Sequence, residues 1–205
     1  TNLSTAMEWR APPLYATATS SFTKGCNVFE QSMGRGGQEL FLEPSLAHHV
    51  GSQEACFKSA RAKIIGRGGS KNTVVDCGGH RCFVSGYVKK TNAWMFASKI
   101  HGITFINGGH HQFGGFLYIH GFSDTFGINL KDVIFRNGIA GIMGGAIFVE
   151  HCYLLNGIEN SRIVISATFI DGFAGKYGGA IGILSSDSVV IEHSTFLNVS
   201  SGSAG

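Results

Sequence analysis

The sequence predicts an all-β protein that folds as a right-handed parallel β-helix, a solenoid, with a cap region at its N-terminus. Three observations predict this fold: a repeated Gly-Gly-Ala-Ile phrase, a constant distance from that phrase back to a phenylalanine, and a composition rich in glycine but poor in helix-forming runs. Regular repetition every 20 to 50 residues, roughly, is typical of solenoids, propellers and arrays.

The repeat consists of three columns of equivalent residues. Gly-Gly-Ala-Ile stands at 144–147 and at 178–181, each time nine residues after a phenylalanine that Asn or Asp follows by two places. The same spacing fits two further copies. The phenylalanine column is Phe105, Phe135, Phe169 and Phe196, and the polar column is Asn107, Asn137, Asp171 and Asn198. The glycine pairs are Gly144 with Gly145 and Gly178 with Gly179.

The segments around each phenylalanine have the period of a β-strand. Apolar and other residues alternate in Ile103-Thr104-Phe105 and in Ala167-Thr168-Phe169, and Gly and Asn stand at the segment ends. Successive phenylalanines are 30, 34 and 27 residues apart, with the variation confined to one place in each repeat. Propeller blades are longer, at about 40 residues or more. Short strands with loops on one side therefore favour a solenoid.

Stacking at the strand spacing of about 4.8 Å would turn each column into a ladder. We expect the phenylalanines to stack in the core and the Asn column to form a buried ladder in which each amide donates to the next. The aliphatic column five places before each phenylalanine is Ile100, Leu130, Val164 and Ile191. The glycine pair is expected to supply a positive-φ corner or a close backbone approach.

Residues 61–205 are assigned to the β-helix and residues 1–60 to an N-terminal cap or assembly segment. The second assignment rests on Pro12-Pro13 and on few periodic runs before residue 60. The last coil is predicted to be incomplete, because the sequence stops inside the fourth copy. The first residue is Thr1 and not Met, so a processed or partial chain is the simplest interpretation.

Charge and hydropathy argue against two classes of partner. The net charge is +3 and the basic residues are scattered, so no nucleic-acid partner is expected. No stretch approaches the roughly 18 apolar residues that span a bilayer, so no direct membrane insertion is expected either.

We predict no catalytic residues, no metal site and no cofactor. Asp124, Asp132, Asp171 and Asp187 occupy different columns, whereas a β-helix lyase or glycosidase needs clustered carboxylates. Pectate-lyase-like activity is the minor alternative. The histidines are interpreted as solvent-facing loop residues, since zinc needs three or four ligands in a fixed geometry. The eight histidines interpreted in this way are His48, His49, His101, His110, His111, His120, His151 and His193.

Cysteines and sequons bear on the cellular compartment. Cys77 and Cys82 could close a small disulfide loop, or could be two buried thiols. Asn2 and Asn198 each begin an N-glycosylation sequon. For Asn198 the ladder predicts a turn-stacked or inward amide, and the sequon predicts a glycan outside. We favour the ladder for Asn198 and regard Asn2 as the better glycan site.

The Phe-x-Asn and Gly-Gly-Ala-Ile series resembles the repeats of the polymorphic outer membrane protein family, over roughly residues 96–205. The family pattern is Phe-x-x-Asn with Gly-Gly-Ala, so Asn137 and Asn198 stand one place early, Asp171 replaces an Asn, and Phe116 replaces the first Ala. The resemblance implies a parallel β-helix on a cell surface that serves adhesion or structure.

The leading hypothesis is a non-catalytic extracellular β-helix glycoprotein of structural or adhesive function, with a subunit of a surface fibre or filament as one form of that role. Its expected partners are further copies of itself or other surface proteins, with glycans as a further possibility. An unfinished last coil would expose strand edges that favour pairing with another chain. The alternative hypothesis is a carbohydrate-binding or polysaccharide-cleaving β-helix.

Overall fold

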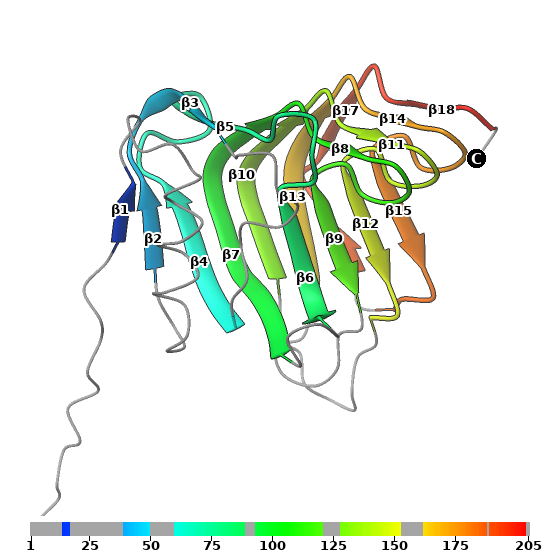
Figure 1. The fold of residues 1–205 in the computed structure, drawn as a ribbon, viewed down its shortest axis with the longest axis horizontal. Coiled ribbons are helices and arrows are strands. Elements are labelled where there is room, and N and C mark those ends of the chain that lie inside the picture. Colours follow the sequence, from blue (N-terminus) through cyan, green and yellow to red (C-terminus); the bar gives the residue numbers. More distant parts are fainter. Residues whose placement is uncertain are drawn as a thin grey trace, which may run out of the picture.

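The chain forms a parallel β-helix, as the repeat predicts (Figure 1). The computed structural model describes residues 14–16, 39–49, 60–88, 93–120, 128–152, 162–187 and 189–203, and every regular element in these ranges is a strand. No helix in the described part of the chain is long and apolar enough to cross a membrane.

From β6 onward the strands stack in three series along the solenoid. In chain order all the described strands are β1 Leu14–Ala16, β2 Glu39–Leu42, β3 Ser45–His49, β4 Ala60–Gly66, β5 Thr73–Asp76, β6 Phe83–Val88, β7 Ala93–Ile106, β8 Gly109–His110, β9 Leu117–His120, β10 Ile128–Arg136, β11 Ile139–Ala140, β12 Ile147–Glu150, β13 Ile163–Ile170, β14 Phe173–Ala174, β15 Ile181–Leu184, β16 Val189–Ile191, β17 Thr195–Leu197 and β18 Ser200–Ser201.

One coil uses one strand from each series. The first series stacks β7, β10 and β13, and the second stacks the short strands β8, β11, β14 and β18. The third stacks β6, β9, β12 and β15. These stacked pairs are parallel, whereas β6 and β7 also meet in one antiparallel pair. The three series enclose the apolar core.

The phenylalanine column stacks inside the coil, which confirms the prediction. Phe105, Phe135 and Phe169 lie opposite one another in the strand register, and Phe196 continues the column. Successive ring centroids are 5.5, 5.4 and 5.0 Å apart, with interplanar angles of 18°, 15° and 9°. Stacked aromatic pairs contribute about 0.5–1.5 kcal/mol beyond their buried area.

The asparagine column also stacks, but the prediction that it is buried is wrong. Asn107, Asn137, Asp171 and Asn198 are all exposed, at the corner that follows the first series of strands. Each has a left-handed backbone, with φ of 55°, 58°, 54° and 51°. Asn and Asp tolerate this conformation better than other residues with side chains. The column is therefore a surface corner where the chain turns.

The amide ladder along this corner is interrupted once. Asn107 Nδ2 donates to Asp76 Oδ1 at 3.1 Å, and Asn137 Nδ2 donates to Asn107 Oδ1 at 3.4 Å. Asn198 Nδ2 donates to Asp171 Oδ1 at 3.2 Å. No side-chain hydrogen bond joins Asn137 to Asp171, because a carboxylate has no proton to donate to the Asn137 carbonyl oxygen.

The conflict at Asn198 disappears, because its amide is at once stacked and exposed. The exposed corner admits both a ladder hydrogen bond to Asp171 and access from solvent. Asn2, the other sequon, lies outside the described residues.

The two glycines of each pair have separate roles. Gly144 and Gly178 have φ of 67° and 60°, so they form a left-handed bend. A Cβ on Gly145 would lie 2.0 Å from the Gly179 carbonyl oxygen, and one on Gly179 would lie 2.3 Å from the Ser200 carbonyl oxygen. Both alternatives predicted for the pair are therefore present, one at each glycine.

One member of the predicted aliphatic column is wrong. Leu130 pairs with Ile165 and not with Val164, and Ile165 is fully buried. The reason is a bulge at Asp132, whose φ is 52°, that β13 lacks. The third coil is one residue shorter before its phenylalanine, so counting back five places selects the wrong residue.

The N-terminal strands extend the solenoid across the predicted boundary at residue 60. β1 pairs in parallel with β2, β2 with β4, and β3 with β5. Leu42 of β2 is fully buried in the common core. The described part of residues 1–60 thus consists of further strands at the N-terminal end of the stack.

The phenylalanine ladder allows a matched comparison of two identical substitutions. Phe135 is 1% exposed between two rings, and Phe196 is 45% exposed with a ring on one side. Phe135→Ala should lower the free energy of unfolding by about 3–5 kcal/mol, as for buried phenylalanines. Phe196→Ala should cost less than half as much. Urea unfolding measures both, and equal losses would contradict a stacked core.

Repairing the amide ladder should stabilise the protein. Asp171→Asn keeps a residue that tolerates the left-handed backbone and adds a donor facing Asn137. We expect the free energy of unfolding to rise by about 0.5–1.5 kcal/mol in urea unfolding at neutral pH. Asn137→Asp is the opposite change, since it removes the donor to Asn107, and it should destabilise. If Asp171→Asn lowers the free energy of unfolding, Asp171 does not interrupt a stabilising ladder of side-chain hydrogen bonds.

Candidate functional site

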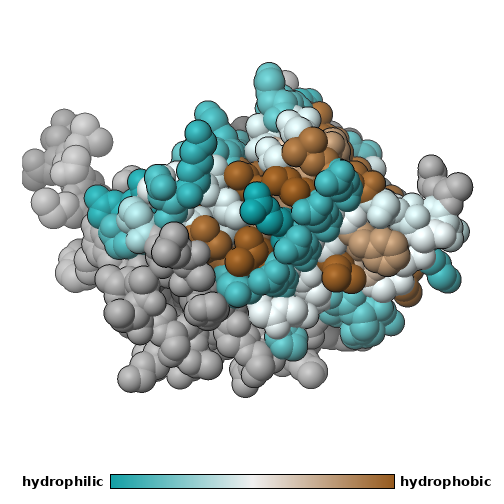
Figure 2. Space-filling view, turned by 90° about the horizontal axis from the view of Figure 1, so that it is seen from above, coloured by the Kyte–Doolittle hydropathy of each residue, from teal (hydrophilic) through white to brown (hydrophobic). Residues whose placement is uncertain are grey.

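A groove of about 710 Å³ lies beside the asparagine corner, between the loop at 78–81 and strands β8 and β11. Its lining residues are Gly79, His80, Arg81, Asn107, Gly108, Gly109, His110, His111, Asn137 and Ile139. Polar and apolar groups both contribute to it. The outer surface seen from above shows the same mixture of hydrophilic and hydrophobic residues (Figure 2).

The groove is hollow because one column loses its side chain. Gly109, Ile139 and Phe173 are aligned in successive coils, and the last two are 55% and 43% exposed. A Cβ on Gly109 would lie 2.4 Å from the Gly79 carbonyl oxygen, so the loop requires glycine there. Ile139 of the next coil then forms an apolar wall.

A disulfide holds the opposite wall. Cys77 and Cys82 are bonded, with Cα atoms 5.4 Å apart, and both are fully buried. Of the two alternatives for these cysteines, the bridge is the one present. Gly79 N–H donates to the Asn107 carbonyl at 2.7 Å, and Gly109 N–H donates to the His80 carbonyl at 3.2 Å. The loop is therefore bonded to the next coil.

Arg81 is 5% exposed, and its guanidinium is engaged by the protein. Its Nε donates to the Gly114 carbonyl at 3.1 Å, and Nη2 donates to the Phe113 carbonyl. Its Cζ lies 4.9 Å from the centre of the Tyr118 ring. A buried guanidinium held by carbonyls and an aromatic face anchors the loop.

His110 has a tautomer set by its backbone neighbours. Its Nδ1 accepts from the N–H of Gln112 at 3.1 Å and of Phe113 at 3.0 Å. The neutral ring therefore carries its proton on Nε2, which is a donor. The His111 ring is 4.3 Å away, centroid to centroid.

The interpretation of the histidines as loop residues needs correction. His101, His110 and His120 lie in strands β7, β8 and β9, and His48 and His49 lie in β3. His101, His110 and His120 are half-buried on these strands. His111, His151 and His193 are exposed. Within the described ranges no three His, Cys, Asp or Glu residues come together to hold a metal.

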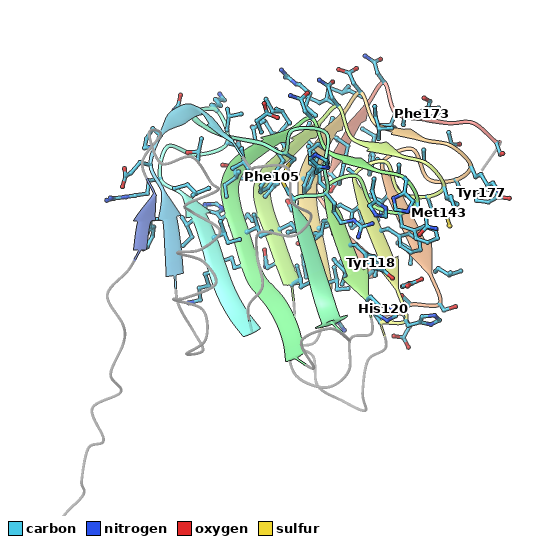
Figure 3. The ribbon with its side chains drawn as sticks, in the orientation of Figure 1. Phe105, Tyr118, His120, Met143, Phe173 and Tyr177 are labelled. Atoms are coloured by element: carbon cyan, nitrogen blue, oxygen red, sulfur yellow. A yellow bond between two sulfur atoms is a disulfide. The ribbon has the colours of Figure 1, made fainter. Side chains whose placement is uncertain are left out.

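The acidic residues in the repeats have separate partners. Asp132 Oδ1 accepts from Ser70 Oγ at 2.7 Å, and Asp171 accepts from Asn198. Asp124 lies outside the described residues. Tyr177 is an exposed aromatic residue. It is 46% exposed and lies beside Met143, with which it forms the isolated β-bridge that precedes β15 (Figure 3). Tyr153 lies outside the described residues.

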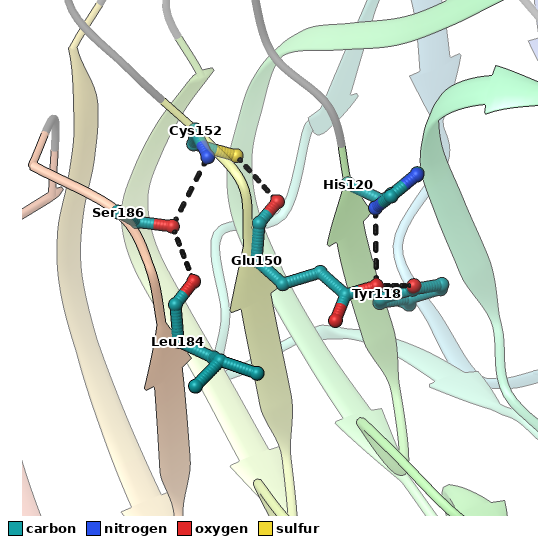
Figure 4. A network of polar contacts seen from close by, with 6 residues as sticks. All are labelled: Tyr118, His120, Glu150, Cys152, Leu184 and Ser186. Atoms are coloured by element: carbon teal, nitrogen blue, oxygen red, sulfur yellow. Dashed lines mark hydrogen bonds and ion pairs between the residues drawn. The ribbon is translucent and has the colours of Figure 1, made fainter.

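A second polar cluster, on the outer face of β9 and β12, was not predicted as a unit. Tyr118 O–H donates to Glu150 Oε1 (Figure 4). His120 Nδ1 lies 3.0 Å from the same oxygen, within ion-pair distance but without hydrogen-bond geometry. Burial, and then the hydrogen bond to Glu150, raise the pKa of the Tyr118 phenol. The sequence feature that could have predicted this cluster is the alternation of apolar and polar residues in β9, since it places Tyr118 and His120 on one face of the strand.

A third feature is the end surface, where three core columns end. Ile183, Ile191 and Phe196 are 41%, 43% and 45% exposed. Their counterparts one coil earlier are Val149, Ile165 and Phe169, which are buried. The end strands β15, β16, β17 and β18 pair on one side within the described chain.

Tyr118 predicts an alkaline loss of stability. Its pKa is raised above the usual value of 10.0, so the neutral phenol stabilises the fold fully below that value. This contribution is lost as the pH rises past it. Tyr118→Phe should therefore show a flatter decline in the free energy of unfolding between about pH 9 and pH 11. Tyr177→Phe, an exposed site, is the control and should keep the parent slope; equal slopes in all three proteins would contradict the assignment.

No family model, no curated protein and no solved structure matches the chain. The resemblance to polymorphic outer membrane protein repeats therefore rests on the motif residues alone.

Proposed function

We propose that the protein is a non-catalytic structural or adhesive β-helix of the cell surface or extracellular space. The disulfide between Cys77 and Cys82 supports that location, because such bonds persist mainly in oxidising compartments. The exposed Asn198 sequon is compatible with it and would make the chain a glycoprotein.

The end surface is the observation that carries the structural role. The apolar side chains of Ile183, Ile191 and Phe196 continue the core columns to an open face. Within the described residues, the adjoining strands β15, β16, β17 and β18 are paired on one edge only, and such edges template further pairing. We propose that another copy of this chain stacks there and continues the solenoid towards a fibre, since head-to-tail contacts of this kind generate filaments.

The test compares two phenylalanines of similar exposure. Phe196 is 45% exposed on the end surface, and Phe173 is 43% exposed on the side of the solenoid. Phe196→Asp should abolish concentration-dependent association in sedimentation velocity, because a carboxylate would be buried against an apolar coil. Phe173→Asp should associate like the parent protein.

Urea unfolding checks that the two variants remain folded. A parent protein that stays monomeric at every concentration measured would refute the stacking proposal. Equal association of the parent and of Phe196→Asp would also refute it.

A further inference from the structure

We infer that the end surface binds strand β1 of a second copy, so that β1 of one copy pairs in parallel with β16 of the other and Leu14 lies opposite Ile191. The inference rests on the proposed function, in which a second copy stacks on the end surface. It adds which strand of that copy makes the contact and in which register. The chain then carries both halves of the contact, with β1 at one end of the solenoid and the end surface at the other (Figure 1).

β1 and β16 are the two ends of one run of parallel strands. The pairing continues from β1 through β2, β4, β7, β10 and β13 to β16, and each of these pairs is parallel. Among the described strands, β1 pairs with β2 alone and β16 pairs with β13 alone. Each therefore presents one edge to a further strand, and such edges template pairing with another chain.

A single aliphatic column joins these two edges. Its members, in order along the solenoid, are Leu14, Leu40, Ile64, Ile100, Leu130, Ile165 and Ile191. The members from Ile64 to Ile165 are buried, whereas Ile191 is 43% exposed. Leu14 of a second copy opposite Ile191 would continue the column with the same kind of residue and remove this apolar surface from water. A slip of one residue would instead place the opposite face of β1 over the core, which fixes the register.

Strand direction selects β1 over a second end surface as the occupant. Head-to-tail stacking keeps the strands of the two copies parallel, as they are from β1 to β16, so the columns continue from one copy into the next. Two end surfaces that met each other would be related by a two-fold axis, and their strands would run antiparallel. A contact between two different surfaces of identical chains is open-ended, so it generates a filament and not a closed dimer.

The experiment is disulfide crosslinking between two variants that each add one cysteine. Leu14→Cys and Ile191→Cys are mixed in equal amounts and treated with oxidised glutathione, and the linked peptides are identified by mass spectrometry. Opposite residues of paired strands lie about 4.8 Å apart, within the range of roughly 4.4–6.8 Å between the Cα atoms of a disulfide. We expect a bond between positions 14 and 191. It can only join different chains, because no chain carries both substitutions.

Val189→Cys is the matched control for Ile191→Cys. Val189 lies on the same face of β16, since its partner Ile163 is buried like Ile165, the partner of Ile191. Two residues of offset place it about 8 Å from position 14, beyond the reach of a disulfide, so the yield with Leu14→Cys should be at least about tenfold lower. Adding Phe196→Asp to Ile191→Cys should remove the bond between positions 14 and 191, because it disrupts the end surface.

A second pair tests the same register on the outward face, where a substitution does not disturb the core. Tyr15 follows Leu14, and Glu192 follows Ile191 and continues the ladder by donating its N–H to the Ile165 carbonyl at 3.0 Å. Tyr15→Cys and Glu192→Cys should therefore also crosslink.

Failure of this inference can be told from failure of the proposed function. A parent protein that stays monomeric would refute both. Association that is lost in Phe196→Asp, with no crosslink in either pair, would overturn the pairing with β1 and leave stacking on the end surface in place. Equal yields at positions 189 and 191 would overturn the register. A bond between two copies of Ile191→Cys in place of the expected one would show that two end surfaces meet, and it would overturn the inference as well.

Discussion

The structure depends on one constraint: equivalent residues of successive coils must lie directly above one another at the spacing of paired strands. Phe105, Phe135 and Phe169 satisfy it as stacked rings about 5.5 Å apart in the core. The same register brings Gly145 to within a carbonyl contact of Gly179, where no side chain would fit. A parallel sheet with one buried face specifies its register strongly, because a one-residue slip would turn core residues outward.

The candidate sites lie where the repeat departs from itself. Gly109 replaces the larger residues of its column and opens the groove, and the loop closed by Cys77 and Cys82 forms the facing wall. Asp171 replaces an asparagine, and a carboxylate cannot continue the ladder as a donor to Asn137. A solenoid offers many similar corners, so a local exception distinguishes one coil from the next. This is consistent with function residing in specific sites and not in the fold as such.

Sequence periodicity predicted the core column reliably. It did not predict whether the asparagine column is buried or exposed, nor the strand register where one strand has a bulge. The phenylalanine column was predicted correctly, because a large ring has one position that buries it in every coil. The asparagine column was predicted as buried, although it lies at an exposed corner; its spacing alone does not separate a core ladder from a surface one. Counting five places back from Phe169 selects Val164, whereas Ile165 aligns with Leu130, since β13 lacks the bulge present at Asp132.

The sequence by itself determined the solenoid and the columns of its repeat, because these follow from regular spacing. The tertiary structure assigned the bend to the first glycine of each pair and the close backbone approach to the second. Only the tertiary structure decided which residues from different coils form the groove, how Tyr118 meets Glu150, and that the core columns reach an open end surface. The physical reason is that such contacts join residues about 30 positions apart whose mutual distance depends on every bulge and loop between them. The spacing of residues within one repeat does not predict these bulges and loops.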